Sequence, residues 1–250
     1  MKPAFRIEDY STTHVGEVRS ENEDSLLSLP EARVWVVADG MGGHANGRYA
    51  SQTIVAAVAQ AQVPETLELA CECVSDAVHA ANAEIYGRSI EDGAQMGSTF
   101  VALVIRDDEF AVLWAGDSRA YVYRDGQLVH LTQDHTQVQA MLDRGLLTPE
   151  EALEHPMRHV LARAVGVEEV LQIDAIRDMV EPRDLFLLCS DGLHGLVSDD
   201  RIAAILAQSG SAAAEDLIAE CLAGGAPDNV TVTLVAAYEP TLLVLSGEAQ

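Results

Sequence analysis

Basic residues are scarce in this sequence. The 250 residues include 40 acidic against 15 basic side chains, which gives a formal net charge of −25. Nucleic acids and anionic membranes bind proteins through basic surface. The sequence therefore predicts that neither is a partner.

Long apolar runs and a targeting segment are also missing. No run approaches the roughly 20 apolar residues that a membrane helix needs. The start of the chain, residues 1–6, lacks the apolar stretch of a signal peptide. We expect a soluble, cytoplasmic protein that acts as a monomer.

Cysteine is rare and is not arranged as a ligand set. No two cysteines have the Cys-x-x-Cys spacing, and each one stands in an apolar pattern. This usage predicts buried free thiols rather than disulfides or zinc ligands. The four residues are Cys71, Cys73, Cys189 and Cys221.

Hydrophobic residues make up 48% of the chain, enough for a sizeable core. Helical spacing predicts two pairs of helices. In the first pair, one helix is capped by Asn46 and the next begins at Pro64. The second pair covers 198–208 and 212–222. Strands are expected where apolar runs occur between these pairs and on either side of them. The runs are 4–29 (one or two strands), 34–37, 99–105, 110–115, 121–129 (a hairpin that turns at Asp125-Gly126), 173–176, 185–189 and 229–237.

This order does not alternate strand with helix, as a parallel sheet would require. Several strands are apolar on both faces, so each face must be covered. We therefore predict an α+β protein with two stacked sheets flanked by helices. No composition break divides the chain, so we predict one domain over residues 1–238 and a loosely held tail over 239–250.

Acidic residues stand where apolar strands reach their loops. The clearest case is Asp39, which ends the run 34–37 and precedes three glycines in four positions. Such a carboxylate, beside accessible turn carbonyls, offers hard oxygen ligands to a divalent cation. The alternative for this stretch alone is an ordinary turn. The design recurs, however, in 22–24, 38–40, 115–119, 189–192 and 226–229.

Carboxylates gathered at one rim of two sheets would repel one another unless cations lay between them. A set of oxygen ligands without cysteine or a clear histidine pair favours magnesium or manganese.

Taken in order, these motifs resemble the metal-dependent serine/threonine protein phosphatases of type 2C, most closely the bacterial single-domain branch. The resemblance spans roughly residues 10–236 and implies an α-β-β-α sandwich of two antiparallel sheets. The motifs are Arg19 with Glu23-Asp24, Asp39-Gly40-Met41-Gly42-Gly43, Gly97-Ser98-Thr99, Gly116-Asp117-Ser118-Arg119, Ser190-Asp191-Gly192 and Asp228-Asn229.

The resemblance implies a two-metal site, with Mn²⁺ or Mg²⁺ as the cofactor. Asp39 would bridge both ions and the Gly40 carbonyl would bind one of them. Asp191 and Asp228 would complete the other shell, and Asp117 would serve a weaker third ion. A hydroxide shared by the two ions would attack phosphorus directly.

Four further roles follow from the same resemblance. Glu23 and Asp24 would act largely through bound water, and Asn229 would orient Asp228. Arg19 would hold the substrate phosphate, for which the forked donors of a guanidinium are well suited.

One departure concerns the general acid. Many eukaryotic members carry histidine directly after the Asp-Gly pair, where this chain has Met41. We expect His44 to be structural or exposed, and water to protonate the leaving group instead. We assign no catalytic role to His135.

The preferred hypothesis is therefore an enzyme that hydrolyses phosphoserine and phosphothreonine in proteins. Its expected partners are phosphorylated proteins, including a eukaryotic-like kinase and that kinase's substrates. The alternative is a pseudophosphatase-like module that binds phosphoproteins without hydrolysis. A nucleotide-binding loop is set aside, because no Gly-Lys-Ser/Thr follows Gly43.

Overall fold

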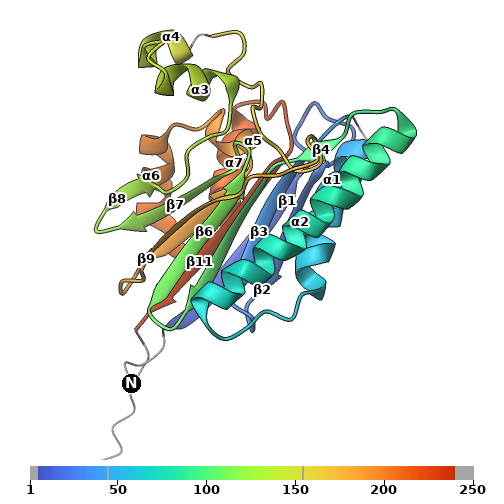
Figure 1. The fold of residues 1–250 in the computed structure, drawn as a ribbon. Coiled ribbons are helices and arrows are strands. Elements are labelled where there is room, and N and C mark those ends of the chain that lie inside the picture. The colour runs from blue at the N-terminus through green and yellow to red at the C-terminus, as the bar shows by residue number, and fades with distance from the viewer. Residues whose placement is uncertain (1–4, 44, 154, 240–250) are drawn as a thin grey trace, which may run out of the picture.

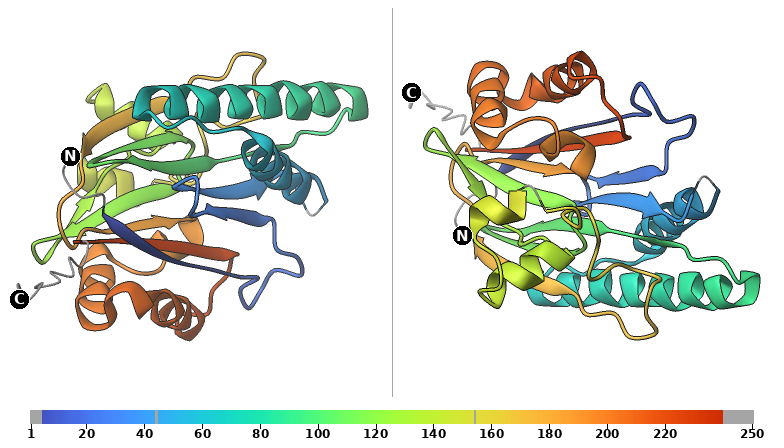
Figure 2. Two further views of the ribbon diagram at one scale, coloured as in Figure 1. Left: turned by 90° about the horizontal axis from the view of Figure 1, so that it is seen from below. Right: turned by 90° about the horizontal axis from the view of Figure 1, so that it is seen from above.

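The computed structural model describes residues 5–43, 45–153 and 155–239. Two β-sheets lie face to face, and a pair of helices covers the outer face of each (Figure 2). The pairing between neighbouring strands is antiparallel throughout the two sheets. The predicted α-β-β-α sandwich is thus confirmed.

The first sheet has the order β1-β11-β10-β7-β8. Its strands are β1 (Arg6–His14), β11 (Val230–Tyr238), β10 (Leu185–Cys189), β7 (Arg119–Arg124) and β8 (Gln127–His130). The segment 4–29 contributes one strand here and one to the other sheet. β1 and β11 are far apart in sequence, yet they pair over their whole length, from Arg6 opposite Tyr238 to His14 opposite Val230.

The second sheet has the order β2-β3-β5-β6-β9, with β4 added beside β3. Its strands are β2 (Asp24–Leu29), β3 (Val34–Met41), β4 (Gly97–Ser98), β5 (Phe100–Arg106), β6 (Glu109–Ala115) and β9 (Asp174–Met179). Every residue of β5 is buried. The apolar character of both of its faces therefore reflects packing on both sides.

Three layers of core hold the sandwich together. The middle layer fills the space between the sheets, where Phe110 and Phe186 meet edge to face with ring centroids 4.8 Å apart. The other two lie between each sheet and its helices. Burial of this apolar surface is the main force that fixes the relative position of the layers.

The helices that cover the second sheet are α1 (Ala45–Gln60) and α2 (Leu67–Asp92). The predicted starts were wrong by one to three residues, because Asn46 already lies inside α1 and the N-cap of α2 is Thr66. The carbonyl of Pro64 instead accepts hydrogen bonds from the Arg106 guanidinium. A tertiary contact thus sets the start of α2.

The first sheet is covered by α6 (Asp199–Ser209) and α7 (Ala213–Ala223), which the short 3₁₀ helix η1 (Gly210–Ala212) connects. Ser198 caps α6 by accepting a hydrogen bond from the Arg201 amide. The β7–β8 hairpin turns as predicted. Asp125 and Gly126 have φ of 51° and 80°, which is typical of a two-residue hairpin turn.

Two short helices, α3 (Gln137–Asp143) and α4 (Pro149–Leu153), lie beyond the upper ends of the strands in Figure 1. They belong to the long connection between β8 and β9. This connection returns across the same end of the sandwich, where the β3 and β10 strands also finish.

Three smaller predictions have mixed outcomes. All four cysteines are free, but only Cys189 and Cys221 are buried, while Cys71 and Cys73 are half-buried on α2. No helix in the described ranges is long and apolar enough to cross a membrane. His44 and residues 240–250 of the predicted tail lie outside the described residues.

Candidate functional site

A cavity of about 700 Å³ opens where strands of both sheets end. Its walls come from loops that are widely separated in sequence. Most of the predicted site residues line it: Arg19, Glu23, Asp39, Gly40, Asp117, Asp191, Asp228 and Asn229. The structure therefore brings together carboxylates that the sequence places up to about 200 positions apart.

Asp39 lies near the end of β3 and is held by its own main chain. Its N–H donates to Thr99 Oγ1 at 3.1 Å, and its carbonyl accepts from the Thr99 N–H at 2.9 Å. The Ser98 hydroxyl donates to the same carbonyl at 2.9 Å. The carboxyl group is thus presented to the cavity from a rigid strand end.

The acidic groups around Asp39 share an electrostatic penalty. Desolvation, followed by the charges of Asp24 and Asp191, raises the pKa of Asp39 well above its usual value. Burial, followed by Asp191, raises the pKa of Asp117 to about 8. Burial and the charge of Asp228 raise the pKa of Asp191. A bound cation would relieve this repulsion and favour the charged forms.

Asp24 lies behind the cavity wall instead of lining it. It is 8% exposed, and its Oδ2 accepts hydrogen bonds from Ser190 Oγ at 2.8 Å and Thr231 Oγ1 at 2.7 Å. Burial raises its pKa to about 7, although these two hydroxyls oppose the shift. Asp24 therefore joins strands of the two sheets directly beneath the site.

Asn229 organises the loop that carries Arg19. Its Nδ2 donates to the carbonyls of Val15 at 2.8 Å and Glu21 at 3.0 Å, and its Oδ1 accepts from the Glu23 N–H at 2.8 Å. Its contact with Asp228 comes from the main chain, whose N–H donates to Asp228 Oδ1 at 2.9 Å. The amide side chain therefore orients the 15–23 loop, and the backbone orients Asp228.

Two glycines allow helix α1 to approach the site. A Cβ on Gly40 would lie 2.1 Å from the carbonyl oxygen of Gly47, and a Cβ on Gly47 would lie 2.0 Å from Glu23 Oε2. Only residues without a side chain fit this crossing. Gly47 was not predicted from the sequence, although a glycine in the first turn of a helix is a signal of close packing.

Arg19 lies at the cavity with its side chain 54% exposed. Its Nη2 donates to Asp228 Oδ2 at 2.8 Å, and this hydrogen bond raises the pKa of the guanidinium. In this geometry the predicted phosphate ligand is paired with a predicted metal ligand.

The structure adds residues that sequence reasoning missed. Arg158, His159, Leu161 and Leu196 also line the cavity. The first three come from an irregular segment after α4, and no periodic pattern places that segment near the carboxylates. Arg158-His159 was the available signal, as an arginine next to a histidine in a chain with few basic residues.

The donor set suits hard divalent cations. Among the described residues, no three His, Cys, Asp or Glu side chains form a ready cluster around one ion. Each ion would thus take a few carboxylates and waters, and one of the ions would also take the Gly40 carbonyl. Magnesium is commonly bound in this way, because it retains several waters. The oxygen-rich walls and the raised carboxyl pKa values fit this kind of binding.

The fold and the cavity together define a class of protein: a two-sheet α-β-β-α sandwich with a carboxylate-rich cavity at one end of the sheets. The chain belongs to the protein phosphatase 2C family, whose profile matches residues 12–224. The resemblance predicted from the motifs is thereby confirmed.

Curated relatives are named as serine/threonine phosphatases. PstP of Mycobacterium tuberculosis is 39% identical over 239 residues, which cover 93% of this chain and 46% of PstP. This chain thus spans about half the length of that relative. The Listeria monocytogenes phosphatase stp is 33% identical over 234 residues, with 89% of this chain and 93% of stp covered.

Solved structures agree with these relatives. PppA, described as a regulatory component of a type VI secretion system in Pseudomonas aeruginosa, superposes with a TM-score of 0.88 at 38% identity, covering 94% of this chain and 99% of PppA. The catalytic domain of PstP with two manganese ions gives a TM-score of 0.81 at 36% identity, covering 93% of this chain and 98% of that domain.

Proposed function

We propose that this chain is a metal-dependent protein phosphatase that hydrolyses phosphoserine and phosphothreonine. The observation that carries the proposal is the convergence of Asp39, Asp117, Asp191 and Asp228 on one cavity, with Arg19 beside them. Family membership supports the reaction class, and the walls of the cavity support the choice of cofactor, Mn²⁺ or Mg²⁺.

Asp39, Asp191, Asp228 and the Gly40 carbonyl would hold two principal ions, and Asp117 would hold a third. When bound, such ions supply a nucleophile from water at neutral pH and neutralise charge that develops on the phosphate. The manganese ions in the related PstP domain support this assignment. Asn229 keeps the ligand loops in place through the hydrogen bonds described above.

Arg19 binds the substrate phosphate in this proposal. Its present partner, Asp228, would be drawn toward a cation, and the guanidinium would then be available to phosphate oxygens. A planar fork with several N–H groups matches two phosphate oxygens at once. Arg19 thus pairs with Asp228 before the substrate enters and with phosphate afterwards.

Met41 lines the cavity and carries no exchangeable proton. We therefore assign protonation of the leaving serine or threonine oxygen to water in the cavity.

The expected substrates are phosphorylated proteins, including a serine/threonine kinase and its targets. The names of PstP and stp support this substrate class. We further propose that the chain acts as a cytoplasmic monomer, with residues 1–238 as its catalytic domain. The net charge of −25 would disfavour highly acidic phosphopeptides outside the reach of bound cations.

Hydrolysis of a phosphothreonine peptide tests the proposal. We expect activity with manganese, loss of activity in EDTA, and little activity on a phosphotyrosine peptide of the same sequence. Full activity in the chelator would refute the metal-dependent reaction. Tight binding of the phosphopeptide without turnover, with manganese present, would favour the binding module instead.

A further inference from the structure

His135 is a largely buried histidine that the proposed reaction does not use. It lies just before α3, with its side chain 10% exposed. Its ring stacks on the indole of Trp114, with ring centroids 6.0 Å apart and an angle of 17° between the planes. In this orientation the two ring nitrogens contact different partners.

The partners fix which nitrogen carries the proton. The Gly116 N–H donates to His135 Nδ1 at 3.1 Å, so Nδ1 presents a lone pair. The proton is therefore on Nε2, which lies 3.1 Å from its acceptor Asp174 Oδ2 and 3.3 Å from Arg163 Nη1. Arg163 Nη1 in turn donates to Asp174 Oδ1 at 2.6 Å. The Arg163–Asp174 pair thus holds the imidazole in one tautomer and one orientation.

The ring and the main chain of His135 together hold both polar groups of Gly116. The His135 N–H donates to the Gly116 carbonyl at 2.9 Å. Gly116 has φ of 112°, and a Cβ there would lie 2.6 Å from Thr99 side-chain atoms, so the turn must form without a side chain. Its conformation therefore depends on the hydrogen bonds made to it.

The residue after this turn is Asp117, which lines the cavity and is 7% exposed. The Asp117 carbonyl accepts from His194 Nε2 at 2.9 Å. Two histidines thus fix the turn: His135 through the main chain of Gly116, and His194 through the carbonyl of Asp117. His135 also contacts the segment after α4 through its main chain.

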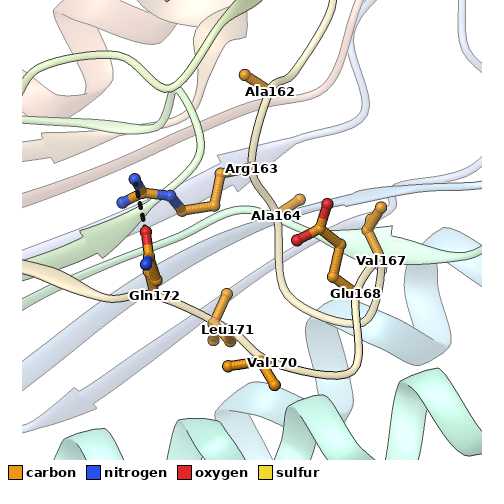
Figure 3. Close-up of a pocket in the computed structure, with 8 residues that line it drawn as sticks. All are labelled: Ala162, Arg163, Ala164, Val167, Glu168, Val170, Leu171 and Gln172. Carbon is orange, nitrogen blue, oxygen red and sulfur yellow. Dashed lines mark hydrogen bonds between the residues drawn. The ribbon is translucent and has the colours of Figure 1, made fainter.

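That second connection runs through the segment after α4. The Ala162 N–H donates to the His135 carbonyl at 2.7 Å. Arg163 also borders a separate cavity of about 420 Å³, and Figure 3 shows its guanidinium turned toward Gln172. His135 therefore joins the Asp117 turn to the segment that carries Arg158 and His159.

We propose that His135 is a positioning residue that fixes the Asp117 carboxylate for its cation. The inference rests on the proposed function, in which Asp117 serves the weaker third ion. Without the Nδ1 contact, the Gly116 N–H is left buried with no acceptor, and Asp117 samples more orientations. The third ion then binds more weakly, while the two ions at Asp39 are little affected.

Two substitutions distinguish the role of Nδ1 from that of Nε2. In His135→Asn the amide oxygen takes the place of Nδ1 and can still accept from Gly116. In His135→Gln the longer amide takes the place of Nε2, which keeps the Asp174 contact and loses the Gly116 contact. The proposal predicts that His135→Asn resembles the parent and His135→Gln does not.

Two measurements detect the difference between the two variants. Hydrogen exchange of the Gly116 amide in the metal-free protein should accelerate about tenfold in His135→Gln, the effect of losing one buried hydrogen bond. Calorimetric titration with Mn²⁺ should show the weakest site weakened by about the same factor in that variant alone. The exchange experiment needs neither metal nor substrate, so it stands even if the phosphatase reaction is wrong.

The matched controls are His130→Asn and His130→Gln. His130 stacks on Tyr121 and contacts Thr132, not Gly116, so both substitutions should leave the two readouts unchanged. Equal Gly116 exchange and equal Mn²⁺ affinity in the two His135 variants would overturn the proposal. If neither variant folds, Asp174→Ala replaces them, and an unchanged Gly116 exchange rate there would overturn it as well.

Discussion

Replacing Asp117 with Asn should stabilise the metal-free protein at neutral pH. The carboxyl group has a usual pKa of 3.8, and in the folded protein the pKa is about 8. A carboxyl pKa that is raised on folding means that the folded state binds the proton more tightly. Stability therefore falls as pH rises from about 4 to about 8, because charging Asp117 is harder in the fold than in the unfolded chain.

The size of the effect follows from the width of this window. pH 7 lies 3.2 pH units above the pKa of 3.8 that Asp117 has in the unfolded chain. Each of these pH units changes the free energy of unfolding by about 1.4 kcal/mol. The ceiling is thus about 4 kcal/mol. Protonation shared with neighbouring carboxyls lowers it, so we expect a gain of about 2–4 kcal/mol. For a chain of this length, that gain raises the melting temperature by about 4–16 °C.

The assay is thermal unfolding in EDTA at pH 4 and at pH 7, with circular dichroism as the probe of unfolding. At pH 7, Asp117→Asn should have a higher melting temperature than the parent. At pH 4 the two melting temperatures should be equal, because the parent carboxyl is already protonated in the folded state. Asp76→Asn removes the same charge from an exposed position on α2 and should change little at either pH. A gain of equal size at both pH values, or none at pH 7, would refute the electrostatic reasoning.

Three further predictions concern the same cavity. Asp39→Asn should lower turnover of a phosphothreonine peptide by several orders of magnitude and weaken Mn²⁺ binding measured by calorimetry, because it removes the charge that two ions would share in the proposed site. Normal binding of two ions with normal turnover would contradict the assignment. Arg19→Ala should lower kcat/KM by about 1.5–3 kcal/mol of transition-state binding, with Mn²⁺ affinity retained, whereas Arg88→Ala on α2 should change neither. Gly47→Ala should destabilise the protein by about 1–3 kcal/mol in chemical denaturation, because its Cβ would lie 2.8 Å from the main chain of Gly40. Equal stability of variant and parent would mean that α1 can move away without cost.

The sequence was most informative where one physical cause dominates. Strand β5 is apolar on both faces because it is buried on both faces, so its pattern predicts a covered sheet. The carboxylates at strand ends were found in the same way, since Asp39 and Asp191 each follow a buried run. Local pattern and tertiary environment agree at these positions.

Prediction was weaker where long-range contacts decide the outcome. The start of α2 depends on Arg106, which is about 40 residues further along and takes the Pro64 carbonyl. Arg158 and His159 reach the cavity through an irregular segment, which no periodicity can position. The role of Asn229 in holding the 15–23 loop likewise depends on a contact across more than 200 residues.

The pairing of β1 with β11 has a consequence for how the protein is made. Asp228 and Asn229 lie directly before β11, which inserts between β1 and β10. During synthesis, the 15–23 loop therefore waits for its hydrogen-bond partner until residues near 238 have left the ribosome. Pairing between such distant segments forms slowly, because the intervening chain must be closed into a loop first. A nascent chain that lacks β11 should thus have no assembled cavity. The cavity therefore forms only after nearly the whole described length of the chain has left the ribosome.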